Sequence, residues 1–535
     1  MTFMGLDLIF ASLSFAFGFR LSYLNIVLAF VVTFFFCYAL QAKIQKSENK
    51  RGIFLQSFLS FTVLFALFLR ISTYFYDVSY DGQTYHQDAI IALSNGWNPY
   101  YGLLPQSFYL WVNHYAKASE ILASSLYLLT GHIEQGKVFN FLFILAVFSL
   151  SFAFTLRWGK LNTLQSFFLS LILALNPVSI TQSLCFYVDG QLASGITLLI
   201  LSLALVFLRL EIPEIMLLFL SILFVVNLKF TGLVYALIFV AFGLFFIFLW
   251  KDALHFKKVA IISGLAFLIA LAGVGFNPYI TNTLTKGNPL YPLAGAQKID
   301  ILTNNTPEID SIHFRSLNRF QQFFYATFSK SHSKLHIEEY PPKIPFGISK
   351  EELSSYGDSS LLFGGFGPFF SGLLLTSLIL GTILLFTLKT APLGWMSGGI
   401  LFALMFSAFL NQGVWWARYV PQLWLIIALV PMLVYVYASQ KWMHRLSHGL
   451  LLLATINLLL VLTSHYAIQS KYSQQVKSQI LSLSKEKQPL KVHFNTFVSN
   501  GKRFEENGIQ FIEVPKQENG RPCFTLSDTQ FYVEP

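Results

Sequence analysis

The stretch Tyr76–Tyr101 reads YDVSYDGQTYHQDAIIALSNGWNPYY and follows directly on an apolar segment, roughly residues 53–75. Besides its many tyrosines it holds four titratable residues: Asp77, Asp81, His86 and Asp88. Carboxylates so close to a hydrocarbon boundary are costly, so they usually face water or a functional site rather than lipid. We therefore interpret this stretch as the catalytic loop of a membrane enzyme.

The composition of the whole chain is that of a membrane protein. Of 535 residues, 55% are hydrophobic and 12% are charged, against roughly 25% charged in a soluble protein, and the mean hydropathy is +0.58. The net charge of +10 is better explained by basic loops beside anionic lipid than by nucleic acid. The three cysteines, Cys37, Cys185 and Cys523, are too far apart in sequence to indicate a zinc site or a disulfide framework.

Thirteen stretches are apolar enough to cross about 30 Å of hydrocarbon, although several are short for that distance. They lie near residues 5–19, 22–42, 53–75, 138–156, 161–176, 190–208, 212–227, 231–250, 259–275, 366–388, 391–409, 420–438 and 447–466. The N-terminus lacks the basic flank and cleavage site of a secretory signal, so we expect the first span to be retained. The sequence therefore predicts an all-α polytopic membrane protein with about thirteen transmembrane helices.

Basic residues alternate between successive connections. One set of connections carries Lys43, Lys46, Lys50, Arg51, Arg157, Lys160, Arg209, Lys251, Lys257, Lys258, Lys389, Lys441 and Arg445. The short connections of the other set carry only Lys229 and Arg418. The positive-inside rule places the first set in the cytoplasm, with the N-terminus, and the 76–137 loop outside.

The predicted domain organisation follows from this threading. We expect an N-terminal hairpin with its cytoplasmic loop (1–52), a membrane core that includes the 76–137 outer loop (53–275), a second outer loop (276–360), C-terminal transmembrane helices (361–466) and a small extracytoplasmic αβ domain (467–535). Within the first outer loop, helical pieces are expected near Asp88–Ser94 and Ala118–Thr130.

Asp81 is the leading candidate for a catalytic group. A partly desolvated carboxylate at a membrane boundary has a raised proton affinity, which suits a general base for a hydroxyl. Asp81 could instead cap a helix, since it precedes Gly82. His86 and Tyr85 follow about one helical turn later and favour the functional interpretation.

Residues 97–100 (Trp97, Asn98, Pro99 and Tyr100) add an aromatic surface of the kind on which sugars stack. Asp77 and Asp88 are assigned supporting or structural roles. In the second outer connection, LNPVSITQSLCFYVDGQLAS, Asp189 is either a helix cap or a second acid that faces the first loop.

Two basic residues and one rigid turn complete the candidate site. Lys229, in VVNLKFTGLVYAL, either snorkels to the headgroups or binds an anion. Arg418, in NQGVWWARYVP, would suit a phosphate or pair with a structural carboxylate. The segment GNPLYPL (Gly287–Leu293), with Tyr291 between two prolines, is a fixed loop that could lie over the site.

Taken together, these motifs resemble the GT-C superfamily of polyprenyl-phosphate-sugar-dependent glycosyltransferases, which includes protein O-mannosyltransferases and the aminoarabinose transferases of lipid A. The resemblance rests on the acidic first loop with Asp81, Tyr85 and His86, on Asp189, on the break at Asn227–Gly232, on GNPLYPL, and on Arg418-Tyr419 before Pro421. It covers roughly residues 53–440 and leaves out the N-terminal hairpin. The first loop has no adjacent pair of acids, so which of Asp77, Asp81 and Asp88 would match the family's catalytic acid stays open.

The resemblance implies an enzyme of the bacterial cytoplasmic membrane whose active site faces outward. It would move a sugar from a polyprenyl phosphate to a hydroxyl of a cell-envelope glycan, lipid or protein. Asp81 would be the base, with His86 beside it, and Asp189 would orient a substrate. Lys229 or Arg418 would stabilise the departing phosphate, with Asp77, Tyr85, Trp97 and Tyr291 also binding substrate. The acids would allow a divalent metal, but a monophosphate donor does not demand one, and no other cofactor or nucleic acid is implied.

Two alternatives belong to other classes. A transporter or flippase for lipid-linked sugars would place polar residues in broken helices near the middle of the membrane, often with internal symmetry, and no such symmetry is visible. A polysaccharide polymerase or ligase would use arginines and histidines of a late outer loop. The 276–360 segment offers His313, Arg315, Arg319, His332 and His336 for that role.

Overall fold

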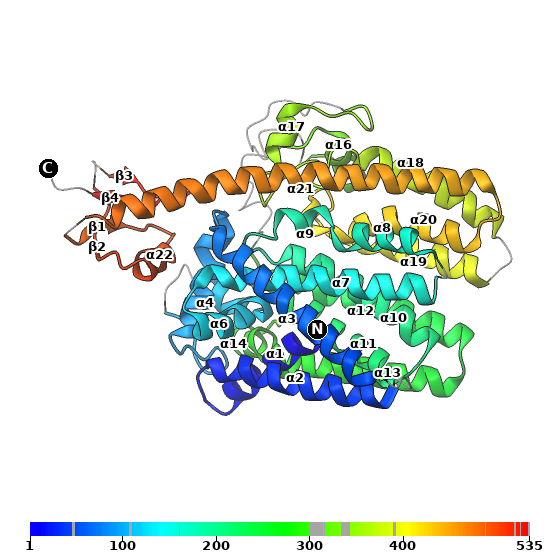
Figure 1. The fold of residues 1–535 in the computed structure, drawn as a ribbon, viewed down its shortest axis with the longest axis horizontal. Coiled ribbons are helices and arrows are strands. Elements are labelled where there is room, and N and C mark those ends of the chain that lie inside the picture. The colour runs from blue at the N-terminus through cyan, green and yellow to red at the C-terminus, as the bar shows by residue number, and fades with distance from the viewer. Residues whose placement is uncertain are drawn as a thin grey trace.

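The computed structural model describes residues 1–44, 49–105, 110–159, 161–299, 314, 316–332, 343–388, 392–486, 488–517, 520–524 and 526–532. In these residues the chain is mainly helical, and its long helices run side by side along the long axis of the molecule (Figure 1). A small sheet lies at one end. The predicted α-helical architecture is confirmed.

All thirteen apolar stretches form helices. In the described residues, eight helices are long and apolar enough to cross a membrane: α2 (Tyr23–Ile44), α3 (Lys50–Tyr74), α7 (Val138–Arg157), α10 (Asp189–Leu208), α12 (Phe230–Trp250), α13 (Ala253–Leu268, continued by η4, Ile269–Val274), α18 (Phe370–Thr387) and α21 (Lys441–Leu483). Five apolar helices are shorter: α1 (Thr2–Ala16), α8 (Thr163–Ala174), α11 (Ile212–Leu228), α19 (Pro392–Leu410) and α20 (Leu425–Tyr437, preceded by η8, Pro421–Trp424). The long helices support a membrane protein, while the figure of thirteen crossings stays a prediction.

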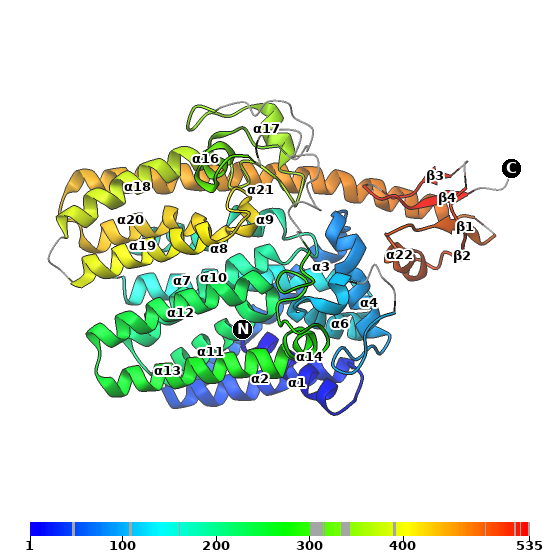
Figure 2. The same ribbon diagram turned by 180° about the vertical axis from the view of Figure 1, so that it is seen from behind.

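Short helices form a layer over one end of the bundle (Figures 1 and 2). They include η1 (Gly82–His86), α4 (Gln87–Ser94), α5 (Leu110–His114), α6 (Ala118–Thr130), η3 (Ile133–Lys137), α9 (Pro177–Thr181), η5 (Phe276–Ile280) and α14 (Thr281–Lys286). α16 (Arg319–Phe328) contacts α18, and α17 (Lys350–Ser355) contacts α21. The two helical pieces predicted in the first outer loop are α4 and α6. Gly131 ends α6, because its positive φ of 71° gives the left-handed turn that stops a helix.

The joint between α11 and α12 is a single residue. Lys229 is extended (φ −159°, ψ 148°) between the last residue of α11 and the first of α12. The reversal is tight enough that a Cβ at Gly232 would lie 1.9 Å from the carbonyl oxygen of Val225. Asn227 supports the joint by donating to the carbonyl oxygens of Leu223 (3.0 Å) and Ala270 (2.9 Å). Glycine and asparagine thus fix the position of Lys229.

The long helix α21 carries a terminal cap. Its 43 residues span about 65 Å at 1.5 Å per residue, and in Figure 1 it runs beyond the bundle to the cap. The helix contains the apolar stretch near residues 447–466 and continues to Leu483, into the segment predicted as the extracytoplasmic domain (467–535). The cap contains β1 (Leu490–His493), α22 (Asn500–Glu506), β2 (Phe511–Glu513), β3 (Arg521–Pro522) and β4 (Gln530–Tyr532). Its strand order is β2-β1-β4-β3, with β1 parallel to β2 and antiparallel to β4.

A buried group of charges, here called the clamp cluster (Asp77, Glu134, Lys137 and Arg503), ties the cap to the first outer loop. Glu134 accepts from Lys137 at 2.6 Å and from Arg503 at 3.2 Å. Arg503 also donates to the main-chain oxygen of Asp77, and Glu134 accepts from the N–H of Asp77 at 3.0 Å. The cap is therefore docked through ion pairs that solvent does not reach.

Candidate functional site

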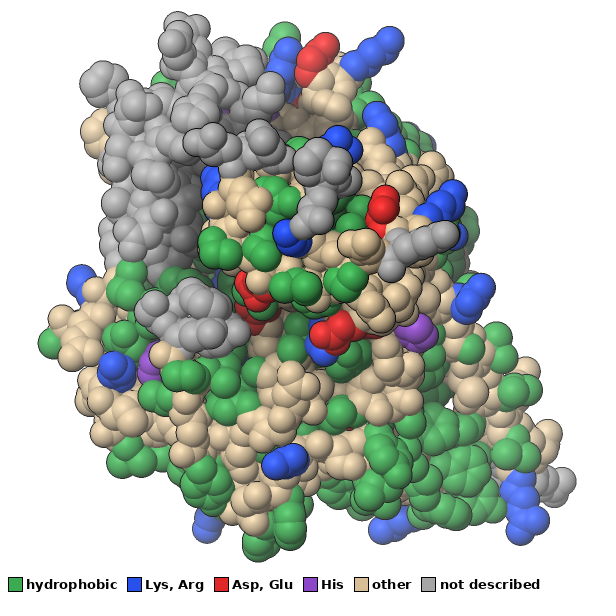
Figure 3. Space-filling view, turned by 90° about the vertical axis from the view of Figure 1, so that its left-hand side faces the viewer, with side chains coloured by type: hydrophobic (Ala, Val, Ile, Leu, Met, Phe, Trp, Pro, Cys, Tyr) green, Lys and Arg blue, Asp and Glu red, His purple; other side chains and the backbone are tan. Residues whose placement is uncertain are grey.

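A cavity of about 270 Å³ lies at the end of the bundle, where the first outer loop, the α11–α12 joint and the cap meet. It is lined by Tyr80, Asp81, Thr84, Tyr85, His86, Trp111, Tyr115, Ala116, Tyr187, Val188, Asp189, Leu228, Lys229, Arg418, Tyr419 and Thr496. Figure 3 views this end of the molecule and shows acidic and basic side chains among apolar ones. Six residues predicted for the site therefore share one cavity: Asp81, Tyr85, His86, Asp189, Lys229 and Arg418.

The first outer loop enters the cavity through the π-helical turn η1. Asp81 precedes this turn, and Tyr85 and His86 are its last residues. Gly82 lies against the Asp77 carboxylate, because a Cβ there would be 2.0 Å from Asp77 Oδ2. π-Helical turns often occur at functional sites, and this one turns Asp81 and His86 toward the same space.

Asp189 lies at the start of α10 and is almost fully buried. Its Oδ1 accepts from the Lys229 ammonium, and its Oδ2 accepts from Gln182 Nε2 at 3.2 Å. The side chain of Asp189 therefore works as an ion-pair partner of Lys229. Asp189 does not act as a helix cap, because no side chain makes a capping hydrogen bond at the start of α10.

Arg418 links the two carboxylates of the cavity loosely. One of its terminal nitrogens is 3.4 Å from Asp81 Oδ2, and its Nε is 3.7 Å from Asp189 Oδ2. The Nε donor is buried and has no hydrogen-bond partner. The guanidinium stacks near Trp416 (4.6 Å) and Tyr187 (4.7 Å). Aromatic walls thus fix its plane while its hydrogen-bonding capacity is only partly used.

These four residues, Asp81, Asp189, Lys229 and Arg418, form what we call the cavity cluster. Two carboxylates balance two cations, so the group is formally neutral without a ligand. The Lys229 ammonium also lies 4.4 Å from the ring centroid of Tyr419. An anionic ligand with one or two negative charges could bind Lys229 and Arg418 in place of the carboxylates that now pair with them.

His86 has a partner that sequence reasoning missed. Its Nδ1 is 2.5 Å from Glu120 Oε1, and both side chains are at least 93% buried. Glu120 lies in the first turn of α6. A glutamate in the otherwise apolar sequence ASEILASSLYLLT is the signal that could have found it.

Three predicted substrate-binding residues lie outside the cavity. Both carboxylate oxygens of Asp77 accept backbone N–H groups, from Ser79 at 2.7 Å and Phe186 at 2.8 Å, and burial raises its pKa. Trp97 donates from its indole N–H to the carbonyl oxygen of Gly102 at 2.8 Å. Tyr291 packs on His114, with ring centroids 4.9 Å apart. Asp77 and Trp97 were proposed from the first outer loop and Tyr291 from the GNPLYPL motif, but none of the three lines the cavity.

The remaining candidates are also placed apart from the cavity. Asp88 is buried in α4, and burial raises its pKa to about 8. Arg319 donates to the carbonyl oxygen of Phe409, and His332 packs on the ring of Phe363. His313, Arg315 and His336 lie outside the described residues. In the part of the chain that the structure describes, no three His, Cys, Asp or Glu side chains gather as metal ligands.

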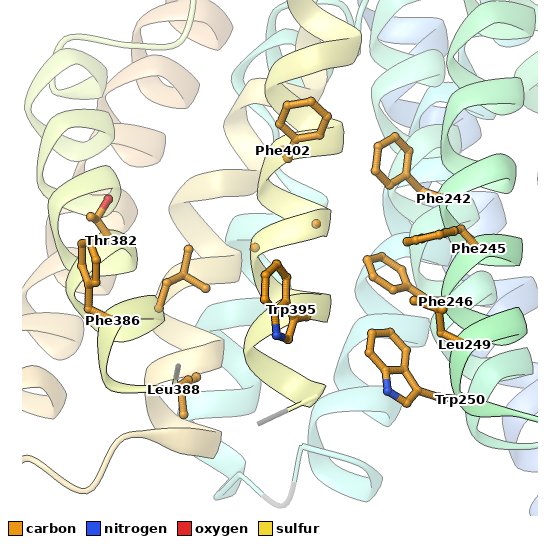
Figure 4. A pocket seen from close by; sticks show the side chains of 13 residues that line it. Phe242, Phe245, Phe246, Leu249, Trp250, Thr382, Phe386, Leu388, Trp395 and Phe402 are labelled. Carbon is orange, nitrogen blue, oxygen red and sulfur yellow. The ribbon is translucent and has the colours of Figure 1, made fainter. Parts of the chain in front are cut away.

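A second cavity of about 440 Å³ adjoins the first and shares Tyr115, Lys229 and Tyr419 with it. It runs between the start of α12 and the end of α19, and it also contains Lys298. Farther along the same two helices, an apolar crevice of about 950 Å³ opens between α12, α18 and α19. Figure 4 shows Phe242, Phe246 and Trp250 of α12 facing Trp395 and Phe402 of α19. Among the described residues, those that line this crevice are uncharged.

Comparison with protein-family models, with curated proteins and with solved structures finds no match for this chain. The function must therefore be argued from the geometry of the site.

Proposed function

We propose that this protein is an integral membrane glycosyltransferase of the GT-C type, which transfers a sugar from a polyprenyl phosphate to a hydroxyl acceptor of the cell envelope outside the cytoplasm. The observation that carries the proposal is the cavity cluster together with His86. A proton acceptor for a hydroxyl and two cations for a phosphate lie in one cavity at the ends of apolar helices.

The chemistry needs few groups. The acceptor oxygen attacks the anomeric carbon, its proton passes to Asp81 or His86, and the bond between the sugar and the phosphate oxygen breaks. The phosphate leaves with the bonding electrons and stays on its lipid. Arg418 and Lys229 stabilise the negative charge that develops on it, which is the largest single contribution in many such reactions. Asp189 holds Lys229 in place.

The crevices along α12 and α19 support a donor with a long hydrocarbon chain. Val234 lines the second cavity and Trp250 lines the apolar crevice. The two residues are sixteen positions apart, which corresponds to about 24 Å of helix. A polyprenyl chain along this face would place its phosphate near Lys229 and Lys298 and its apolar tail among aromatic rings. A soluble nucleotide sugar has no hydrocarbon chain that could occupy this path.

The outward orientation of the site is part of the proposal. It is supported by the alternation of Lys and Arg among the connections. The site lies at the same end as the 76–137 loop, and nucleotide sugars are cytoplasmic, so a lipid must deliver the sugar there.

The test uses the full-length protein in vesicles of the membrane that contains its acceptor, supplied with radiolabelled undecaprenyl-phosphate hexoses and pentoses. Label should move from one of these donors into a membrane-bound product. Asp81→Asn should lower transfer at subsaturating donor by at least about 10-fold, since a general base contributes about 10²–10⁴ and a stabilising charge about 10²–10³.

Asp528→Asn is the matched control, because it neutralises an exposed aspartate of the cap and should leave transfer unchanged. Mass spectrometry of surface glycans with and without the protein should show one sugar missing. Movement of the lipid-linked sugar across the vesicle membrane without any glycosylated product would refute the transferase and favour a flippase.

A further inference from the structure

The cavity contains two groups that could accept a proton, and their surroundings differ. Asp81 Oδ2 lies 3.4 Å from both terminal nitrogens of Arg418. The Asp81 carboxylate is thus already the countercharge of Arg418. His86 also lines the cavity, and in the described residues its ring contacts Glu120, Tyr85 and Tyr187, none of which is a cation.

The contact with Glu120 decides which ring nitrogen of His86 is available to a substrate. An ionised carboxylate only accepts hydrogen bonds, so beside an ionised Glu120 the ring donates from Nδ1. The lone pair of the neutral imidazole is then on Nε2. In the described residues the ring makes no other hydrogen bond.

The surroundings of Glu120 leave its carboxylate available to His86. Its Oε2 is buried without a hydrogen-bond partner, and its Oε1 bonds His86. Lys117, three residues earlier in the chain, donates to the carbonyl oxygen of Tyr115 and to Asn277 Oδ1, both at 2.6 Å, and burial lowers its pKa to about 7. A buried carboxylate in this position stabilises an imidazolium that forms during a reaction, as the aspartate does in a Ser-His-Asp triad.

We propose that His86 is the general base of the transfer reaction and that Glu120 is its positioning residue, whereas Asp81 orients Arg418 toward the donor phosphate. The assignment rests on the proposed function. In the step, Nε2 of His86 takes the proton of the acceptor hydroxyl as the oxygen bonds to the anomeric carbon. The sugar–phosphate bond breaks, the lipid phosphate leaves as the anion, and the imidazolium later releases its proton to solvent. No oxidant, metal or further reactant is needed.

The kinetic test compares variants on the two sides of the cavity, with the labelled undecaprenyl-phosphate sugar that the wild type uses. Glu120→Gln should lower kcat by about 100-fold with KM nearly unchanged, because a correctly positioned general base contributes 10²–10⁴. Glu120→Asp, which keeps the charge, should recover part of that loss. His86→Ala should be inactive, and added imidazole should restore part of its activity. Asp81→Asn should act mainly on the KM of the donor.

The opposite pattern overturns the assignment. Wild-type kcat in Glu120→Gln, or a kcat lost in Asp81→Asn with no imidazole rescue of His86→Ala, would make Asp81 the base. Should His86→Ala not fold, as judged by size-exclusion chromatography, the comparison of Glu120→Gln with Glu120→Asp decides, because neither variant empties the buried site. Equal kcat in these two variants would also refute a role for the charge.

A spectroscopic measurement separates this proposal from the proposed function. The ¹⁵N spectrum of histidine-labelled full-length protein, assigned with His86→Gln, should show the proton of the neutral His86 ring on Nδ1. A proton on Nε2 would refute the assignment whatever the activity, because that nitrogen could not accept another. Failure of every sugar donor together with an Nδ1 proton would refute the transferase and retain an oriented, proton-accepting histidine.

Discussion

The clamp cluster and the cavity cluster have the same composition, two carboxylates and two cations, yet they are built differently. In the clamp, Glu134 is bonded to both Lys137 and Arg503, and both oxygens of Asp77 accept backbone N–H groups. In the cavity, Arg418 keeps 3.4 Å from Asp81 and 3.7 Å from Asp189 and has an unused donor. Arg503 also has a buried Nε without a hydrogen-bond partner, so the two clusters differ in their distances and in the space beside them. Arg503 is held at 3.2 Å by Glu134 and by Gln83, whereas Arg418 keeps longer distances from its carboxylates and borders an open cavity in which it can turn toward a ligand.

The largest effect is expected from breaking the clamp. Arg503→Met removes one of the two cations that pair with Glu134, and it removes the donor to the main-chain oxygen of Asp77. Removal of one partner from a buried ion pair typically costs about 3–5 kcal/mol, so the free energy of unfolding should fall by that order. Chemical unfolding of the purified protein measures it, and limited proteolysis between α21 and β1 reports release of the cap.

Lys502→Met is the matched control for this change. Lys502 is the neighbouring cation, and its partner Glu505 has a half-exposed side chain, so stability should hardly change. Equal loss in the two variants would mean that the cap is not docked through the clamp.

The complementary change in the cavity should affect catalysis more than stability. Arg418→Lys keeps the charge but loses the planar set of donors, so kcat should fall by about 100-fold while the melting temperature moves by less than about 3 °C. Steady-state transfer assays and thermal unfolding of the same preparation measure both. Arg319→Lys, at an exposed arginine, serves as control. A large loss of stability with unchanged turnover would show that the cavity cluster, like the clamp cluster, has a structural role only.

A smaller effect, visible in the pH dependence of stability, is expected at Asp88, which is buried in α4. Burial raises the pKa of Asp88 to about 8, whereas an unfolded aspartate titrates near about 3.9. Between these values the folded protein holds a proton that the unfolded chain has lost, so stability falls as pH rises. Asp88→Asn should remove up to about 1.4 kcal/mol per pH unit from that slope.

Unfolding free energies measured at intervals from pH 5 to pH 8 test this, with Asp528→Asn as the control. An unaltered slope in Asp88→Asn would show that Asp88 is ionised in the folded protein.

Hydropathy predicted most of the helices because lipid-facing and core-facing residues are both apolar in a membrane bundle. It failed at α21, where the polar sequence after residue 466 reads as a tail although the helix continues to Leu483. The end of an apolar stretch marks where lipid contact stops, not where the hydrogen-bonded backbone stops.

The site was predictable in part. Asp81, Asp189, Lys229 and Arg418 came from charges next to apolar segments, and charge alternation assigned them to one end of the bundle. Glu120 was missed because it lies inside an apolar helix and pairs with His86 across 34 residues. Trp97 was included because it is close to Asp81 in sequence, which does not make it close in space.

Because α21 is uninterrupted, its length also sets the direction in which the cap faces around the axis of that helix. Each residue of an α-helix adds 1.5 Å and about 100°. A single alanine inserted between Tyr466 and Leu483 would therefore swing Arg503 away from Glu134 by roughly a quarter turn. A seven-residue insertion, close to two full turns, would restore the direction but raise the cap by about 10 Å. The length of this helix is thus as much a part of the docking of the cap as the charges themselves.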